Sequence, residues 1–136
     1  MEGHACSYCD HIIPTQRFRT TKHKGETLYF CDEKGELGHY SKWQKLCAAK
    51  EASLAILNIA KNYNLGVCEK NIRDVFRIYE MRGIALQLME RIKDNAHRIL
   101  KRATASIKKL LLHLKTIADA VELEVQYQQL KALLVR

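Results

Sequence analysis

The chain lacks a long apolar segment. No apolar run approaches the roughly 20 residues that a helix needs to cross a bilayer. Residues 1–4 do not begin a basic region followed by an apolar stretch, as a secretory signal would. The 136 residues also contain only 1 Pro, 1 Trp and 6 Gly. The missing apolar run and the missing signal predict a protein without a membrane span or an export signal, and the expected compartment is the cytoplasm.

Groups that would catalyse a reaction are missing as well. The sequence shows no paired carboxylates for acid–base work, no nucleophile beside a base and no glycine-rich loop that could cradle phosphates. We therefore do not expect an enzyme. What the chain does contain is a hydrophobic share of 47% and a formal net charge of +8. The charge favours acidic partners such as nucleic acid or an anionic membrane, and a basic surface without such a partner is the alternative.

Five cysteines are present, an odd number, and Cys6 and Cys9 form a Cys-x-x-Cys pair. Without an export signal, metal ligation or free thiols are favoured over disulfides. The pair has the spacing of a knuckle, a tight turn that directs two thiolates at one ion. Two short strands, 16–20 and 27–30, are predicted on either side of a Lys-His-Lys-Gly turn, and Cys31 ends the second strand.

Three thiolates leave a closed zinc site one ligand short, because structural zinc is four-coordinate. His39 is the favoured fourth ligand, since it follows a glycine-containing turn and just precedes an expected helix. The alternatives are Cys47, His23, His4 and His11. The predicted role is structural, because an electron-rich set of thiolates makes a poor Lewis acid. A redox or incidental cysteine pair is the other interpretation.

Two segments carry a resemblance. Cys-Ser-Tyr-Cys-Asp-His-Ile-Ile-Pro from Cys6 and Lys-Gly-Glu-Thr-Leu-Tyr-Phe-Cys from Lys24 resemble the treble-clef fingers of the TRASH/MYM group and of a related zinc-bearing large-subunit ribosomal protein. The resemblance covers residues 5–45 and implies metal at the three cysteines. The chain departs from the pattern at Gly35, where those fingers carry a fourth cysteine. A metal-handling or metal-sensing role is a further function that the group permits.

A pair of helices is expected next, over 41–62 and 69–82, with an Asn-Tyr-Asn-Leu-Gly break between them. Ser41 is a suitable N-cap for the first, and Gly83 is expected to interrupt or end the second. Residues 59–77 are similar to a helix-turn-helix whose turn is about two residues longer than usual. The side chains that would then face a major groove include Lys70, Asn71 and Arg73. An ordinary antiparallel helical hairpin is the alternative.

Residues 84–136 contain no glycine or proline and keep one apolar stripe at the helical period. Because the phase of the stripe hardly drifts, one continuous helix is favoured over two. The period of about 3.6 favours packing in a bundle over an extended two-stranded coiled coil. The polar last turns are typical of a helix that meets a protein neighbour or a second subunit.

The opposite face of this segment is basic. Between Arg91 and Lys115 the only acid is Asp94, so this stretch supplies nearly all of the net charge of +8. Its cations form the expected footprint for a phosphate backbone: Arg91, Arg98, Lys101, Arg102, Lys108, Lys109 and Lys115. The hairpin adds Arg17, Arg19, Lys22 and Lys24. A solvated face is the alternative, and a membrane surface is not favoured because Trp and Phe are absent from the apolar face.

The predicted fold is therefore mainly α, with a small β-hairpin zinc finger in residues 1–40 and a helical domain in residues 41–136. The predicted function is that of a non-enzymatic, zinc-containing protein that binds DNA or RNA, as a transcriptional regulator or as part of a nucleoprotein assembly. The alternative is a protein–protein adaptor or inhibitor of a nucleic-acid-handling machine, with a purely structural zinc. A protein partner or a second copy would contact the C-terminal helix, and no membrane contact is expected.

Overall fold

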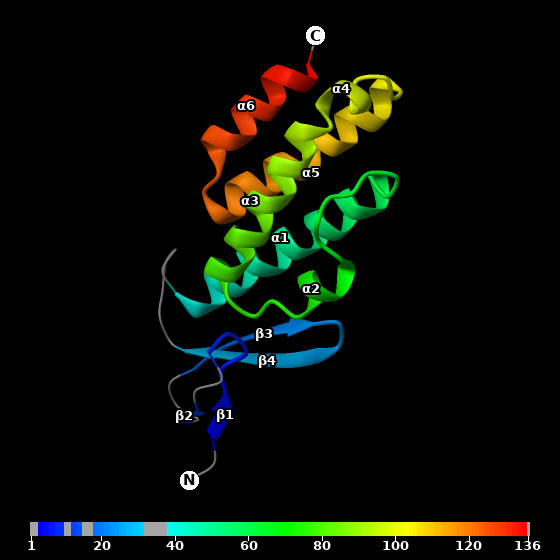
Figure 1. Ribbon diagram of the computed structural model, residues 1–136. Coiled ribbons are helices and arrows are strands. Elements are labelled where there is room, and N and C mark those ends of the chain that lie inside the picture. The colour runs from blue at the N-terminus through cyan, green and yellow to red at the C-terminus, as the bar shows by residue number, and fades with distance from the viewer. Residues whose placement is uncertain (1–2, 10–11, 15–17, 32–37, 136) are drawn as a thin grey trace. The chain divides into compact units, whose positions relative to one another are not determined.

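The computed structural model describes residues 3–9, 12–14, 18–31 and 38–135 (Figure 1). The chain forms two compact units, Met1–Lys45 and Leu46–Arg136. The strands within the described residues are β1 (Gly3–Ala5), β2 (Ile12–Pro14), β3 (Phe18–His23) and β4 (Glu26–Cys31). The helices are α1 (His39–Ile59), α2 (Glu69–Arg73), α3 (Ile78–Asp94), α4 (Ala96–Ile99), α5 (Thr104–Val121) and α6 (Glu124–Leu134). The predicted mainly α fold with a small N-terminal β-hairpin is confirmed.

The first unit contains the predicted hairpin. Strands β3 and β4 pair in antiparallel fashion from Phe18 opposite Cys31 to the tip. Lys24 and Gly25 form the tip, with φ of 52° and 83°. Two successive residues with positive φ match the right-handed twist of a hairpin, and glycine adopts this conformation without steric cost. A second antiparallel ribbon, β1 with β2, was not predicted from the sequence.

Aromatic rings form the small core of this unit. Phe30 on β4 is fully buried, and its ring centre lies 5.2 Å from that of Tyr40 and 5.4 Å from that of Trp43, both at the start of α1. The rings of His23 and Trp43 are perpendicular, with their centres 5.0 Å apart. These contacts join the hairpin to the first turns of α1, so the start of α1 and the end of β4 belong to one small structure.

In the second unit, the predicted break after the first helix is confirmed. Gly66 has a φ of +70°, and its amide donates to the side-chain oxygen of Asn64 at 3.1 Å. Gln87 Nε2 on α3 then donates to the Gly66 carbonyl at 2.8 Å. The asparagine and glycine therefore form the turn that their conformational preferences predict, and a distant helix holds it in place.

The predicted second helix over 69–82 is wrong. Helix α2 ends at Arg73, and α3 begins only at Ile78 and runs through Gly83. Lys50 of α1 explains the interruption, because its Nζ donates to the carbonyl oxygens of Arg73 and Val75, at 2.9 Å each. A helix end leaves carbonyl groups without partners, and here a side chain more than twenty residues away supplies the donor.

The predicted continuous helix over 84–136 is also wrong, because the structure divides this segment into the end of α3 and helices α4, α5 and α6. At Asn95 the side chain turns back and donates Nδ2 to the carbonyl of Arg91 at 2.8 Å. At Glu122 the chain adopts a φ of 59°, and the next amide, that of Leu123, donates to the carbonyl of Ala118 at 3.0 Å. This hydrogen bond is that of a Schellman motif, and Leu123 is fully buried beyond it.

The division lets the apolar stripe fold back on itself. Helices α3, α5 and α6 run alongside one another (Figure 1), and their contacts make the core of the second unit. Its buried side chains include Leu88, Met89, Ile92, Leu110, Leu114, Ile117, Tyr127 and Leu130. The expected packing in a bundle is therefore found, and the bundle is formed by helices α3, α5 and α6 of the same chain. Among the described residues, no helix has both the length and the apolar character that crossing a bilayer requires.

Candidate metal centre and basic end

The four predicted metal ligands come from four places in the first unit. Cys6 directly follows β1, and Cys9 closes the turn after it. Cys31 is the last residue of β4, and His39 is the first residue of α1. The amide of Ser7 donates to the carbonyl of Tyr29 at 2.8 Å, which ties the knuckle to the hairpin. The turn, the strand end and the helix start thus converge.

The ligand atoms of these four residues all lie within 4.8 Å of one another. Cys6 Sγ is 3.6 Å from His39 Nδ1, and Cys9 Sγ is 3.7 Å from Cys31 Sγ. Tetrahedral zinc with Zn–S near 2.3 Å would place sulfurs about 3.8 Å apart, and a sulfur and a ring nitrogen about 3.6 Å apart. The two short separations match these values. The donor set and its geometry therefore fit a closed, four-coordinate metal site.

No protein-family model, curated protein or solved structure matches this chain. The resemblance to treble-clef fingers stays a prediction, and the assignment of the site depends on its own geometry.

The thiols of this cluster differ in their surroundings. Burial raises the pKa of Cys6, but hydrogen bonds from the backbone of Cys9, Cys31 and Tyr8 outweigh it and lower the pKa to about 7. Burial also raises the pKa of Cys31, and the neighbouring Cys9 and Cys6 thiols raise it further, to about 12. Several thiolates cannot share so small a volume unless a cation offsets their charge. This is the electrostatic pattern of ligands gathered for a metal.

The side chain of His39 is held by its neighbours. Its ring centre lies 5.3 Å from that of buried Tyr8, and its Nδ1 faces Cys6. Among the described residues, the cluster includes neither Cys47, which lies farther along α1, nor His23, which contacts Trp43. The other candidate ligands lie outside what the structure describes: His11 entirely, and His4 for its side chain. Gly35, where the resemblance places a fourth cysteine, lies outside it too.

The predicted nucleic-acid contacts of the hairpin and of α2 belong to different units of the chain. Lys22 and Lys24 are exposed. Arg17 lies outside the described residues, as does the side chain of Arg19 on β3.

On α2, Lys70 and Asn71 are exposed, and Arg73 Nε donates to Glu69 at 2.8 Å. The five-residue α2 is short for the recognition helix that the helix-turn-helix interpretation requires. The helix-turn-helix interpretation therefore gains no support here.

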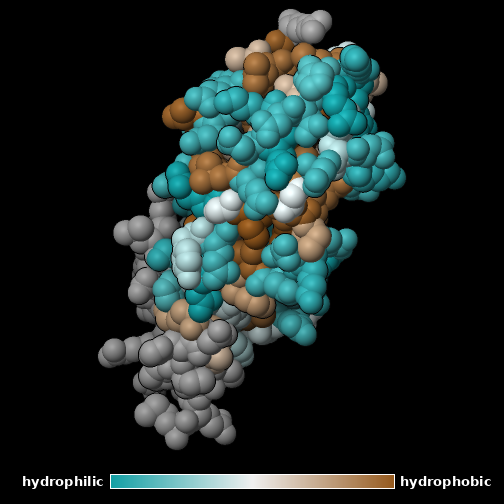
Figure 2. Space-filling model, in the orientation of Figure 1, coloured by the Kyte–Doolittle hydropathy of each residue, from teal (hydrophilic) through white to brown (hydrophobic). Residues whose placement is uncertain are grey.

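The arc predicted on one long helix is wrong as a single helical face. Most of its cations lie on the end of α3, on α4, in the link to α5 and on the first turns of α5, around one end of the second unit (Figure 1), whereas Lys115 lies farther along α5. We call this set the basic end: Lys93, His97, Arg98, Lys101, Lys108 and Lys109, all exposed. In Figure 2 the visible surface over α4 and the start of α5 is mostly hydrophilic. Lys93 and His97 were missed, although they lie in the same basic stretch.

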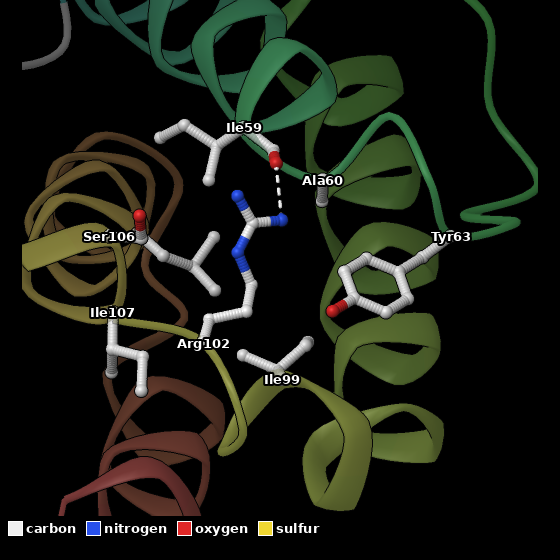
Figure 3. A pocket seen from close by; sticks show the side chains of 8 residues that line it. Ile59, Ala60, Tyr63, Ile99, Arg102, Ser106 and Ile107 are labelled. Atoms are coloured by element: carbon white, nitrogen blue, oxygen red, sulfur yellow. Dashed lines mark hydrogen bonds between the residues drawn. The ribbon is translucent and has the colours of Figure 1, made fainter. Parts of the chain in front are cut away.

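Arg102 has a structural contact rather than a free charge. Its Nη1 donates to the carbonyl of Ile59 at 2.8 Å, and its guanidinium crosses a narrow apolar pocket (Figure 3). Tyr63, Ile99 and Ile107 line the same pocket, which is too narrow to hold a water molecule. The guanidinium therefore serves the C-terminus of α1, which has no basic residue in its own last turn.

The other cations divide into engaged and free groups. Arg98 places its guanidinium 5.0 Å from the ring centre of Tyr63. Lys115 donates to Glu124 at 2.9 Å and pairs with Asp119 at 3.2 Å, and these two contacts raise its pKa. Its charge is thus offset by two carboxylates. The remaining lysines of the basic end (Lys93, Lys101, Lys108 and Lys109) have no hydrogen bond or ion pair with any described residue.

Proposed function

We propose that this chain is a non-enzymatic, zinc-containing protein that binds nucleic acid, as a transcriptional regulator or as a component of a nucleoprotein assembly. Zinc would be held by Cys6, Cys9, Cys31 and His39, and would fold the N-terminal unit. The knuckle, hairpin and helix start are the parts that treble-clef fingers also use, so the resemblance belongs to the proposal. Three thiolates and a histidine favour Zn²⁺ among common cellular metals and make a structural site.

The observation that carries nucleic-acid binding is the set of free lysines at the basic end. A lysine in an ion pair attracts a polyanion less strongly, because a carboxylate already offsets its charge. Four lysines of the basic end are exposed and lack such pairs among the described residues: Lys93, Lys101, Lys108 and Lys109. Only Asp94 opposes the positive charge between Arg91 and Lys115. Phosphate contacts release counterions, so affinity should fall steeply as salt rises.

Binding to random DNA and RNA is the direct test, measured by fluorescence anisotropy from about 50 to 200 mM salt, the range over which several phosphate contacts have a large effect. The double variant Lys101→Gln/Lys109→Gln should weaken binding about tenfold and reduce the salt slope by about two. Lys22→Gln/Lys70→Gln removes the same charge from the hairpin and α2, and should change binding less. Absence of binding at the lowest salt would overturn the proposal. A larger loss of affinity in the control pair would assign the phosphate contacts to the hairpin and α2 instead of the basic end.

A protein–protein adaptor is the second candidate, and a groove between α5 and α6 favours it. The groove of about 290 Å³ is lined by five apolar and three polar residues: Leu100, Ile107, Leu111, Leu134 and Val135, with Arg102, Thr104 and Lys108. Leu112 and Leu133, on the same two helices, are 65% and 43% exposed. Exposed apolar surface of this kind marks contact sites for proteins. Concentration-dependent mass by light scattering, together with no polyanion binding, would favour this candidate and a contact between two copies.

A further inference from the structure

Tyr63 and Arg98 form a cation–π pair at the basic end. The guanidinium carbon of Arg98 lies 5.0 Å from the Tyr63 ring centre, within the range of a cation–π contact. Arg98 Nη1 also donates to Asn95 Oδ1 at 3.3 Å. The residue is nevertheless exposed, so a cation that contacts an aromatic ring remains open to solvent.

The loop that carries Tyr63 is held in position from two sides. At its start, Arg102 donates to the carbonyl of Ile59 at 2.8 Å, and Tyr63 lines the pocket that Arg102 crosses (Figure 3). At its end, Gln87 donates to the carbonyl of Gly66 at 2.8 Å. A ring fixed in this way loses little conformational entropy when another flat group stacks over the pair.

Charge near the pair suits a nucleic-acid strand. Lys61 and Asn62 precede Tyr63 and are exposed, and Lys101 follows Arg98 by three residues and is exposed as well. Proteins that bind single strands combine such cations, which follow the backbone, with flat side chains on which bases stack. Arginine guanidinium planes serve as stacking surfaces for unpaired bases in the same way.

A duplex fits this arrangement poorly. Reading a major groove takes a helix or a two-stranded ribbon that presents a row of side chains. Here the cations follow a bent path through α4, which has four residues, and through the link before α5. Bases inside a duplex also have no free face to stack on Arg98. We infer that the basic end binds a single-stranded segment of nucleic acid, with an unpaired base stacked on Arg98 over Tyr63, an inference that rests on the proposed function.

The test compares labelled oligouridine, oligothymidine and a hairpin duplex of about 12 nucleotides per strand, within the site sizes of single-strand binders. The Arg98→Lys variant keeps the charge and loses the planar guanidinium. It should bind both single strands about tenfold more weakly, and the duplex within about twofold of the wild type. Lys101→Gln is the matched control, since it removes a charge and leaves the stack. It should weaken all three probes by the same factor.

A second variant pair guards against misfolding. Tyr63→Phe keeps the ring and should bind single strands as the wild type does, whereas Tyr63→Leu should reproduce the loss seen for Arg98→Lys, with thermal melts confirming that each variant folds. Equal losses on single strand and duplex for Arg98→Lys, or no loss at all, would overturn the inference while leaving nucleic-acid binding intact. If the wild type binds none of the probes at about 50 mM salt, where phosphate contacts are strong, the proposed function itself fails, and the inference with it.

Discussion

Arg102 donates a hydrogen bond of 2.8 Å to the carbonyl oxygen of Ile59, forty-three residues earlier in the chain. The contact joins the link before α5 to the last residue of α1, where a carbonyl has no partner within its own helix. A cation at this position also interacts favourably with the negative end of the helix dipole. One side chain from the basic stretch is therefore used to hold the second unit together.

The Arg102→Ala variant should accordingly lose stability. A hydrogen bond from a charged donor contributes about 1.5–3 kcal/mol, and removal of the guanidinium also exposes the apolar pocket lined by Ile99 and Ile107. Urea unfolding should show a loss of about 2 kcal/mol. The control is Arg82→Ala, an exposed arginine on α3, for which the change should stay within about 0.5 kcal/mol. Equal losses in the two variants would contradict the structural role of Arg102.

Removal of one thiolate should abolish metal binding and unfold the first unit alone. The purified protein should contain one zinc per chain, and Cys31→Ala should contain none. Trp43, the only tryptophan, packs on Phe30 next to Cys31, so its emission should shift to longer wavelength in this variant or on addition of a strong chelator. Helicity of the second unit should persist, because its core contains no metal ligand. Cys68→Ala, which removes an exposed cysteine outside the cluster, should keep the zinc. A metal-free wild type would contradict the site.

The identity of the fourth ligand is testable on its own. His39→Cys keeps a donor at the start of α1 and should retain zinc, since four thiolates form a common closed site. His39→Ala leaves three ligands and should bind zinc much more weakly, as competition with a chromophoric chelator would measure. Cys47→Ala should be indistinguishable from the wild type. A stronger effect of Cys47→Ala than of His39→Ala would assign the fourth ligand to Cys47.

The ligand set could be predicted from the sequence because its signals are local. Cys6 and Cys9 have knuckle spacing, Cys31 ends an aromatic strand and His39 just precedes an expected helix. Each of these features depends on a few neighbouring residues. The hairpin was predictable for the same reason, since Gly25 provides the positive φ that its turn requires.

The helix boundaries were not predictable because distant or unusual residues set them. Lys50 supplies the donor that lets α2 stop at Arg73, and nothing near Arg73 in the sequence reveals it. The turn between α5 and α6 places Glu122 at a φ of 59°, where glycine is the usual residue. An unbroken apolar stripe therefore predicted one helix where the structure has three longer helices and one short one. Because one continuous helix was predicted over 84–136, the contact between Tyr63 and Arg98 was not predicted either.

Two glycines should respond in opposite directions to substitution by alanine. Gly66 has a φ of +70°, and an added Cβ would lie 2.9 Å from Gln87 Nε2 and 3.3 Å from Arg91 Nε. Gly66→Ala should therefore destabilise the second unit by about 1–2 kcal/mol, through backbone strain and displacement of Gln87. Gly83 lies inside α3, and a Cβ there would meet nothing within 4 Å. Gly83→Ala should stabilise by about 0.5–1 kcal/mol, because alanine restricts the unfolded chain and favours the helix. Urea unfolding of both variants measures the two changes, and a stabilising effect at Gly66 would show that the turn is not held as described.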